Sequence, residues 1–175
     1  ETSFDGTLSA QGGAKSGNGG LAETSGNKLQ VGDDAKVVTE APNGITGTWL
    51  LDPTDITVSS SGTDGIGGSN IKSSTITGAL ASTNVMLEAT HDITINSIIS
   101  YSSAHSLSLL AGQDITFNAS VQNSSSGGID AFAGWDGTTT DSSALTNASA
   151  YGNHNGQLLI GRPDASVFTT ETLAN

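Results

Sequence analysis

The chain has 175 residues, with five Lys and Arg against 17 Asp and Glu, for a formal net charge of −12 at pH 7. That charge argues against nucleic acid and anionic membranes as partners, because both attract basic surfaces. The chain has no cysteine, which excludes disulfides and thiolate metal sites.

The aliphatic residues predict an all-β fold. They stand in short runs in which apolar and polar residues alternate, which is the pattern of half-buried strands. No stretch of ten residues has convincing helical periodicity. Aromatic residues make up only 5% of the chain, so a thick layered core would be hard to fill.

In chain order, the first segment is residues 1–46, which is rich in glycine and is predicted to form the leading coils of a repetitive fold. Residues 47–137 are predicted to form regular coils. Within them "SNIKSSTITGAL", residues 69–80, shows strand-like alternation with Ile71 and Ile76 as its apolar positions.

The stretch "GTWLLDPTDITV", residues 47–58, is the heaviest apolar concentration in a polar chain. Trp49 and either Leu50 or Leu51, with Leu51 as our assignment, are predicted to fill the interior. A turn is predicted next, because proline lacks a ladder donor and fits a corner or an edge. The structural residues assigned to this stretch are Trp49, Leu51, Asp52, Pro53 and Ile56, the last pointing inward from the next strand.

Three segments align at a spacing of 22 residues: "VMLEATHDITIN" (85–96), "LSLLAGQDITFN" (107–118) and "IDAFAGWDGTTT" (129–140). In each, apolar residues alternate, a small residue follows, and an aspartate precedes the next run. A unit of this size cannot bury its own apolar face, but stacking on its neighbours creates a continuous core. The repeat therefore predicts a parallel β-helix, a solenoid with coils of about 22 residues. A polar loop excursion at residues 138–156 and a terminal coil at 157–175 complete the chain.

Two motifs resemble a known family. "GNGGLAETSG" (residues 17–26) and "APNGITGTWLLDPTDITV" (residues 41–58) resemble the filamentous-haemagglutinin-like exoproteins of Gram-negative bacteria, adhesins exported by two-partner secretion. The secretion domain of that family often carries an "NPNGI"-like motif, of which only "PNGI" (residues 42–45) is present here. The chain therefore resembles a passenger segment rather than the secretion domain.

The resemblance implies a right-handed parallel β-helix, export through an outer-membrane transporter partner, and an extracellular or cell-surface location. It also implies attachment to a host receptor, a glycan or a biofilm polysaccharide. No run of 18 apolar residues exists, so we expect no insertion into a membrane.

The aspartates of the repeat, Asp92, Asp114 and Asp136, are predicted to stack at one corner of the coils. One interpretation is a row of carboxylates that binds Ca²⁺, which takes several oxygen ligands. The other is turn chemistry, in which each carboxylate accepts hydrogen bonds from nearby backbone N–H groups. Stacked like charges repel, so either cations or backbone donors must compensate them.

No catalytic residues are expected. Asp33 and Asp34 are adjacent, and adjacent side chains on a strand face opposite ways, so they cannot easily cooperate. The three histidines, His91, His105 and His154, lack the spacing of metal ligands. We therefore predict a non-enzymatic protein with no cofactor beyond the calcium considered above.

Phe132, Trp135 and Tyr151 are the candidate ligand-binding residues, because aromatic rings in a polar setting can stack on sugars. Phe132 alternates opposite to Ala131, so it is expected to point outward or under a loop. Trp135 has the alternative of capping one end of the core.

The predicted function is a non-enzymatic extracellular adhesin segment, a β-helical stalk that presents a surface for attachment. The alternative is a structural subunit that assembles end to end into a filament. Both ends of the chain keep strand-like alternation without an obvious cap, and unpaired β-edges can pair with another chain.

Overall fold

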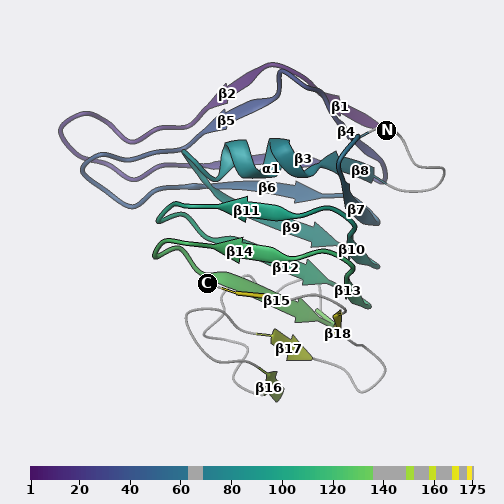
Figure 1. The fold of residues 1–175 in the computed structure, drawn as a ribbon. Coiled ribbons are helices and arrows are strands. Elements are labelled where there is room, and N and C mark those ends of the chain that lie inside the picture. The colour runs from purple at the N-terminus through teal and green to yellow at the C-terminus, as the bar shows by residue number, and fades with distance from the viewer. Residues whose placement is uncertain (63–68, 136–148, 152–157, 161–166, 170–172, 175) are drawn as a thin grey trace.

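The structure, a computed structural model, describes residues 1–62 and 69–135, and beyond these only the backbone of four short strands. The described residues are mostly β-strand, and they include one short helix. Nearly all strand pairs are parallel, and the strands stack into layers along one direction (Figure 1). The all-β prediction is confirmed in part, as a mostly-β architecture of parallel strands with one short helix as the exception.

The largest sheet has seven strands and is called the long sheet below. Six of its strands run parallel, and each pairs with the strand of the preceding or following unit. In spatial order they are β3 (Leu21–Ser25), β6 (Thr48–Asp52), β9 (Asn84–Ala89), β12 (Leu107–Ala111), β15 (Ile129–Ala133) and β17 (Leu158–Ile160). The seventh strand, β16 (Ser149–Tyr151), is antiparallel to β17.

Two smaller sheets run beside it. The five-stranded sheet contains β8 (Ser69–Lys72), β7 (Ile56–Ser59), β10 (Ile93–Ile95), β13 (Ile115–Phe117) and β18 (Val167–Thr169) in spatial order. The three-stranded sheet contains β11 (Ile99–Tyr101), β14 (Val121–Asn123) and β19 (Leu173–Ala174). Near the N-terminus, β1 (Thr2–Phe4) pairs with β4 (Leu29–Val31), and β2 (Thr7–Ser9) pairs with β5 (Lys36–Val38).

The 22-residue period is the register of the central strands. Val85 pairs with Leu107, and Leu107 pairs with Ile129, each at an offset of 22 residues. Ile93 pairs with Ile115 at the same offset in the five-stranded sheet. The columns seen in the sequence are therefore cross-strand neighbours, so identical apolar positions stack on one another.

Residues 47–137 were expected to form regular coils, but the 22-residue period does not extend over all of them. Trp49 pairs with Val85 at an offset of 36 residues, and Ala22 pairs with Trp49 at an offset of 27. The added length contains β8, which pairs with β7 as a second strand in the same sheet, and the helix that follows it. The unit between β6 and β9 is therefore enlarged rather than regular.

The helix α1 (Ser73–Ala79) corrects the expectation of strand alternation through residues 69–80. Ile71 does lie on a strand, but Ile76 lies on α1 and is fully buried together with Leu80. Residues four apart share one helix face, so a single turn buries both. The helix lies between β5 and β11, where it fills the position of a strand (Figure 1). Burial of this apolar face overrides the strand propensity of the threonine- and isoleucine-rich segment.

Residues 138–156 are not loop throughout, because β16 lies within them and forms a hairpin with β17. An alternating triplet such as Ser149–Tyr151 is too short to stand out in a polar sequence. The rest of that predicted loop lies outside the described residues.

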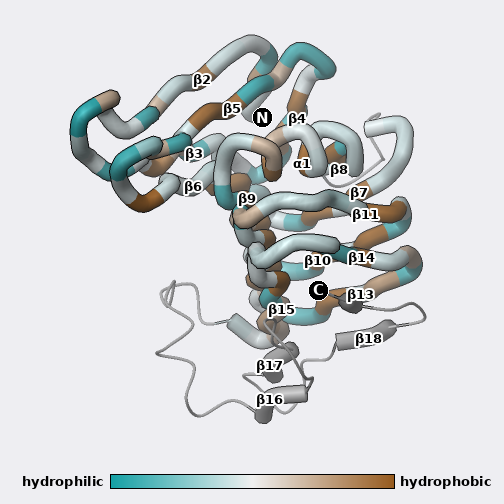
Figure 2. Tube along the Cα trace, turned by 60° about the vertical axis from the view of Figure 1, so that its left-hand side comes forward, coloured by the Kyte–Doolittle hydropathy of each residue, from teal (hydrophilic) through white to brown (hydrophobic). Residues whose placement is uncertain are grey.

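The core runs between the sheets and contains the "TWLLDP" stretch. Trp49 and Leu51 are fully buried, and Ile56 is buried at the start of β7. The indole N–H of Trp49 donates a hydrogen bond of 3.0 Å to Thr24 Oγ1, and its ring meets Phe4 edge-on at a centroid distance of 6.0 Å. Figure 2 shows apolar residues along the stacked strands and hydrophilic residues on the loops beyond β2 and β3.

Candidate functional site

In the aspartate column, a backbone N–H of one unit donates a hydrogen bond to the aspartate carboxylate of the neighbouring unit. Asp114 donates its backbone N–H to Asp92 Oδ1 at 3.0 Å, and Asp92 donates its own to Asp55 Oδ1 at 3.3 Å. Each carboxylate thus accepts the N–H of the corresponding corner in the next unit, which favours turn chemistry over a row of free metal ligands. Asp136 lies outside the described residues.

Replacing Asp92 separates the hydrogen-bonding role from charge. Asp92→Ala leaves the Asp114 N–H without this acceptor, and we expect a loss of about 1–3 kcal/mol in the free energy of unfolding. Asp92→Asn keeps an acceptor oxygen, so its loss should be less than half as large. Urea unfolding monitored by circular dichroism measures both, and equal losses for the two variants would contradict the proposed role.

The predicted aromatic patch does not present Phe132 to solvent. Phe132 does point away from the main core, but it is only 6% exposed and packs against Leu110, with Met86 and Trp135 beside them. Its ring therefore lacks a free face for stacking on a sugar. Trp135 is half-buried in the same cluster, and the side chain of Tyr151 lies outside the described residues.

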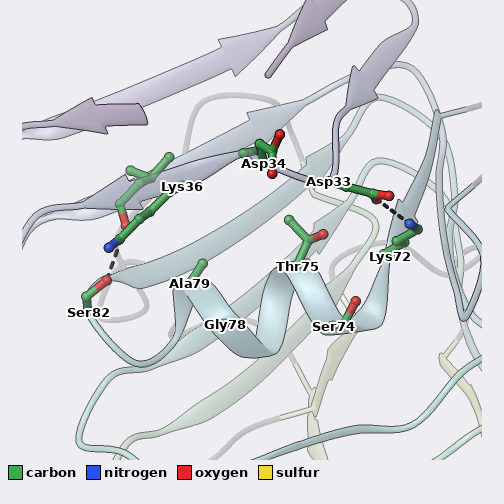
Figure 3. A pocket seen from close by; sticks show the side chains of 11 residues that line it. Asp33, Asp34, Lys36, Lys72, Ser74, Thr75, Gly78, Ala79 and Ser82 are labelled. Carbon is green, nitrogen blue, oxygen red and sulfur yellow. Dashed lines mark hydrogen bonds and ion pairs between the residues drawn. The ribbon is translucent and has the colours of Figure 1, made fainter. Parts of the chain in front are cut away.

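A cavity of about 560 Å³ lies between α1 and the β4–β5 corner. Figure 3 shows side chains from both sides of it, with hydroxyl groups on the helix and charged groups at the β4–β5 corner, on β5 and at the start of α1. Its polar lining consists of Asp33, Asp34, Lys36, Lys72, Ser74, Thr75 and Ser82. The cavity could not be predicted from the sequence, in which the Asp33–Asp34 pair shows no cooperative arrangement, because only the helix brings residues 72–82 opposite residues 33–37.

Among the charged side chains of this cavity, Lys72 and Asp33 are paired with each other. The Ser82 hydroxyl donates to the carbonyl of Val37 at 3.2 Å. Lys36 is exposed and projects into the same opening (Figure 3). Two of the chain's five basic residues thus line one cavity of a protein with a net charge of −12. The arrangement suits a polar ligand with hydroxyl or carboxylate groups.

A row of carboxylates lies on the outer face of the long sheet. Along β6 and β9 the inward positions are apolar, so Asp52 and Glu88 point outward by alternation. The register that pairs Leu51 with Leu87 places Asp52 beside Glu88, and Glu23 of β3 lies diagonally from Asp52. Glu23 is exposed, Asp52 is half-buried and Glu88 is only 4% exposed.

Glu88 is the unusual member of this row. Its Oε1 is buried and has no hydrogen-bond partner. Burial, and then the charges of Asp52 and Glu23, raise the pKa of Glu88 to about 7. Burial and the charge of Glu23 also raise the pKa of Asp52. Glu88 was not among the predicted site residues. The sequence feature that could have identified it is a charged residue at an outward position of an alternating strand.

The raised pKa makes Glu88 a source of pH-dependent stability. Between pH 4.5, the ordinary pKa of a glutamate, and about pH 7, the folded chain holds a proton that the unfolded chain has released. The free energy of unfolding therefore falls as the pH rises from 4.5 to about 7, because ionising the buried Glu88 carboxyl is unfavourable in the folded chain. We expect Glu88→Gln to raise the melting temperature by a few degrees at pH 8 and to leave it nearly unchanged at pH 4.5.

Calorimetric melting across pH 4–9 measures this effect, and Glu40→Gln is the matched control, because Glu40 is exposed and does not act on Glu88. A pH profile of Glu88→Gln that overlays the wild-type profile would exclude this carboxyl as the source.

Two of the three histidines, His91 and His105, lie in the described part of the chain. His105 Nδ1 lies 2.8 Å from the carbonyl oxygen of Leu80, and His91 Nδ1 lies 3.7 Å from Asp55 Oδ1. In the described part of the chain, no three His, Cys, Asp or Glu side chains form a group placed to hold a metal ion. His154 lies outside that part.

Comparison with known protein families, with curated proteins and with solved structures finds no match to this chain. Among the described helical residues, none forms a segment long and apolar enough to cross a membrane. In the described part of the chain, the cavity beside α1 and the carboxylate row both present charged side chains.

Proposed function

We propose that this chain is a segment of a right-handed parallel β-helix that serves as a non-enzymatic extracellular adhesin. The observation that carries the proposal is the register of the central strands. Val85, Leu107 and Ile129 pair in parallel at a constant offset of 22 residues, as do Ile93 and Ile115. A fold that stacks equal units can be lengthened without a new core, which suits a stalk that carries a binding surface away from a cell.

The family proposal rests on the sequence motifs. The segments 17–26 and 41–58 resemble filamentous-haemagglutinin-like exoproteins, so we propose a Gram-negative cell-surface or released protein. An outer-membrane transporter would then be the partner of the parent chain. Host receptors, glycans or biofilm polysaccharide would be the targets of attachment.

The cavity beside α1 is the part of the surface that we propose for contact with a glycan. Its hydroxyl groups and its charges of both signs can hydrogen-bond a polyhydroxylated ligand. Because Lys72 is paired with Asp33, Lys36 is the lysine that can meet the carboxylate of an acidic sugar. The preformed shape limits the ordering cost of binding.

Binding of the fluorescently labelled chain to a panel of acidic and neutral polysaccharides, and to epithelial cells, tests the proposal. We expect binding to an acidic glycan, and we expect Lys36→Ala to weaken it roughly tenfold. Lys15→Ala is the matched control, because Lys15 is also exposed but does not line the cavity. Absence of binding to every surface would overturn the adhesin proposal, and equal binding by both variants would move the contact elsewhere.

A filament subunit is the second candidate. In the described part of the chain, β3 ends the long sheet, and β1 and β2 each pair on one side only. Leu8 and Leu21, on β2 and β3, are exposed at 37% and 63%. Such an edge can accept another strand. Negative-stain microscopy of the purified chain separates the candidates, since regular fibres would support the subunit and dispersed particles the stalk.

The proposal excludes catalysis and a required cofactor. Two neighbouring carboxyls with unequal pKa values, such as Asp52 and Glu88, are the arrangement used in glycoside hydrolysis. Here Glu88 is only 4% exposed, so a sugar ring has no access to it. The carboxylate row is therefore better suited to a small cation than to a sugar.

A further inference from the structure

We propose that Asp52 and Glu88 form a binding site for a divalent cation, with calcium as the best-suited ion, on the outer face of the long sheet. The site differs from the aspartate column that the sequence suggested for calcium. It goes beyond the adhesin proposal and does not depend on which glycan or receptor the chain binds.

The first argument is an unsatisfied buried oxygen. Only 4% of Glu88 is exposed, and its Oε1 has no hydrogen-bond partner. A buried carboxylate oxygen without a partner is costly, so native structures rarely leave one without a proton, a donor or a cation. By contrast, Asp55 and Asp92 of the corner column already accept backbone N–H groups.

The second argument is the charge around Glu88. Asp52 lies beside Glu88 on β6, and Glu23 lies one strand further away on β3, while the neighbouring outward residue of β12 is the uncharged Leu110. Among the described residues, no Lys, Arg or His forms an ion pair with any of these three carboxyls. The protein thus supplies no positive charge of its own at this place.

The spacing of neighbouring strands allows one ion to reach both carboxylates. Adjacent strands lie about 4.8 Å apart, and calcium binds carboxylate oxygens at about 2.3–2.6 Å, so one ion can bridge two outward carboxylates on neighbouring strands. The row runs from the exposed Glu23 through the half-buried Asp52 to the buried Glu88, which gives an ion a path from solvent. Since the described residues hold no ready group of three ligands, water completes the coordination and Glu23 contributes its charge.

The test uses the full chain with calcium chloride or with EDTA. At pH 8 we expect saturating calcium to raise the melting temperature by roughly 5 °C, and Glu88→Gln and Asp52→Asn each to abolish the rise. Asp92→Asn should keep it, because Asp92 belongs to the corner column. Since Glu88→Gln is expected to stabilise the fold at this pH, loss of the calcium effect cannot be ascribed to unfolding.

Two results would overturn the proposal. An unchanged melting temperature of the wild type in calcium at pH 8 would leave Glu88 as a site for a proton only. A calcium effect that survives Glu88→Gln but disappears in Asp92→Asn would place the ion at the corner column instead. Either outcome leaves the adhesin proposal intact, since that is tested by glycan and cell binding.

Discussion

Trp49→Ala is expected to cost about 3–5 kcal/mol in the free energy of unfolding, the range for removing a large buried aromatic side chain. Trp49 is fully buried, its indole N–H donates a hydrogen bond to Thr24, and its ring meets Phe4 edge-on. Its removal opens a cavity that the surrounding backbone cannot close, because strand positions are fixed by the ladders on both sides. Denaturant unfolding of the purified variant measures the loss.

Three further variants make that result specific. Trp49→Phe keeps much of the packing but loses the hydrogen bond to Thr24, so about 1–2 kcal/mol should be lost. Leu51→Ala should cost about 2–4 kcal/mol, and Leu50→Ala markedly less, because Leu51 is fully buried while Leu50 points outward. Equal losses for the two leucines would contradict the inward and outward assignment of β6.

Gly127→Ala is expected to destabilise the chain by about 3 kcal/mol, because a side chain at this position overpacks the stack. A Cβ at Gly127 would lie 1.9 Å from the carbonyl oxygen of His105, a residue 22 positions earlier in the chain. Gly112 has the same relation to Thr90, with a distance of 2.1 Å. The contact is with backbone, so it can be relieved only by moving adjacent units apart.

Gly78→Ala is the matched control, because a Cβ at Gly78 would meet nothing within 4 Å. Gly78 lies within α1, where alanine is favoured over glycine by about 0.5–1 kcal/mol. We therefore expect the same substitution to stabilise the chain at residue 78 and to destabilise it at residue 127. Thermal unfolding shows this as melting shifts of opposite sign, and shifts of the same sign would refute the close packing of the corners.

Much of the repeating architecture could be read from the sequence because it depends on local pattern. The alignment of Val85 with Leu107 placed residues that are paired in the sheet, and alternation predicted which side chains of β6 point inward. The aspartates of the corners were open to two interpretations. Only the positions of the Asp92 and Asp114 backbones showed that the carboxylates accept N–H groups.

The candidate sites were harder to predict, because each is made by elements that the pattern does not connect. α1 has the sequence of a strand and becomes a helix because its apolar face is buried between β5 and β11, and that placement creates the cavity containing Lys36 and Lys72. Phe132 was expected to point outward or under a loop; it does point away from the main core, but its burial depends on Leu110 of the preceding strand, β12.

The sequence by itself determined the mostly-β character of the chain, the 22-residue register of the central strands and the inward residues of those strands. These properties follow from alternation and periodicity, which act over a few residues. The tertiary structure decided which outward side chains meet. Asp52 and Glu88 are 36 residues apart and become neighbours only because the unit between β6 and β9 is enlarged by β8 and α1. No local pattern encodes that offset, so the carboxylate row and the raised pKa of Glu88 emerge only when the strands are stacked.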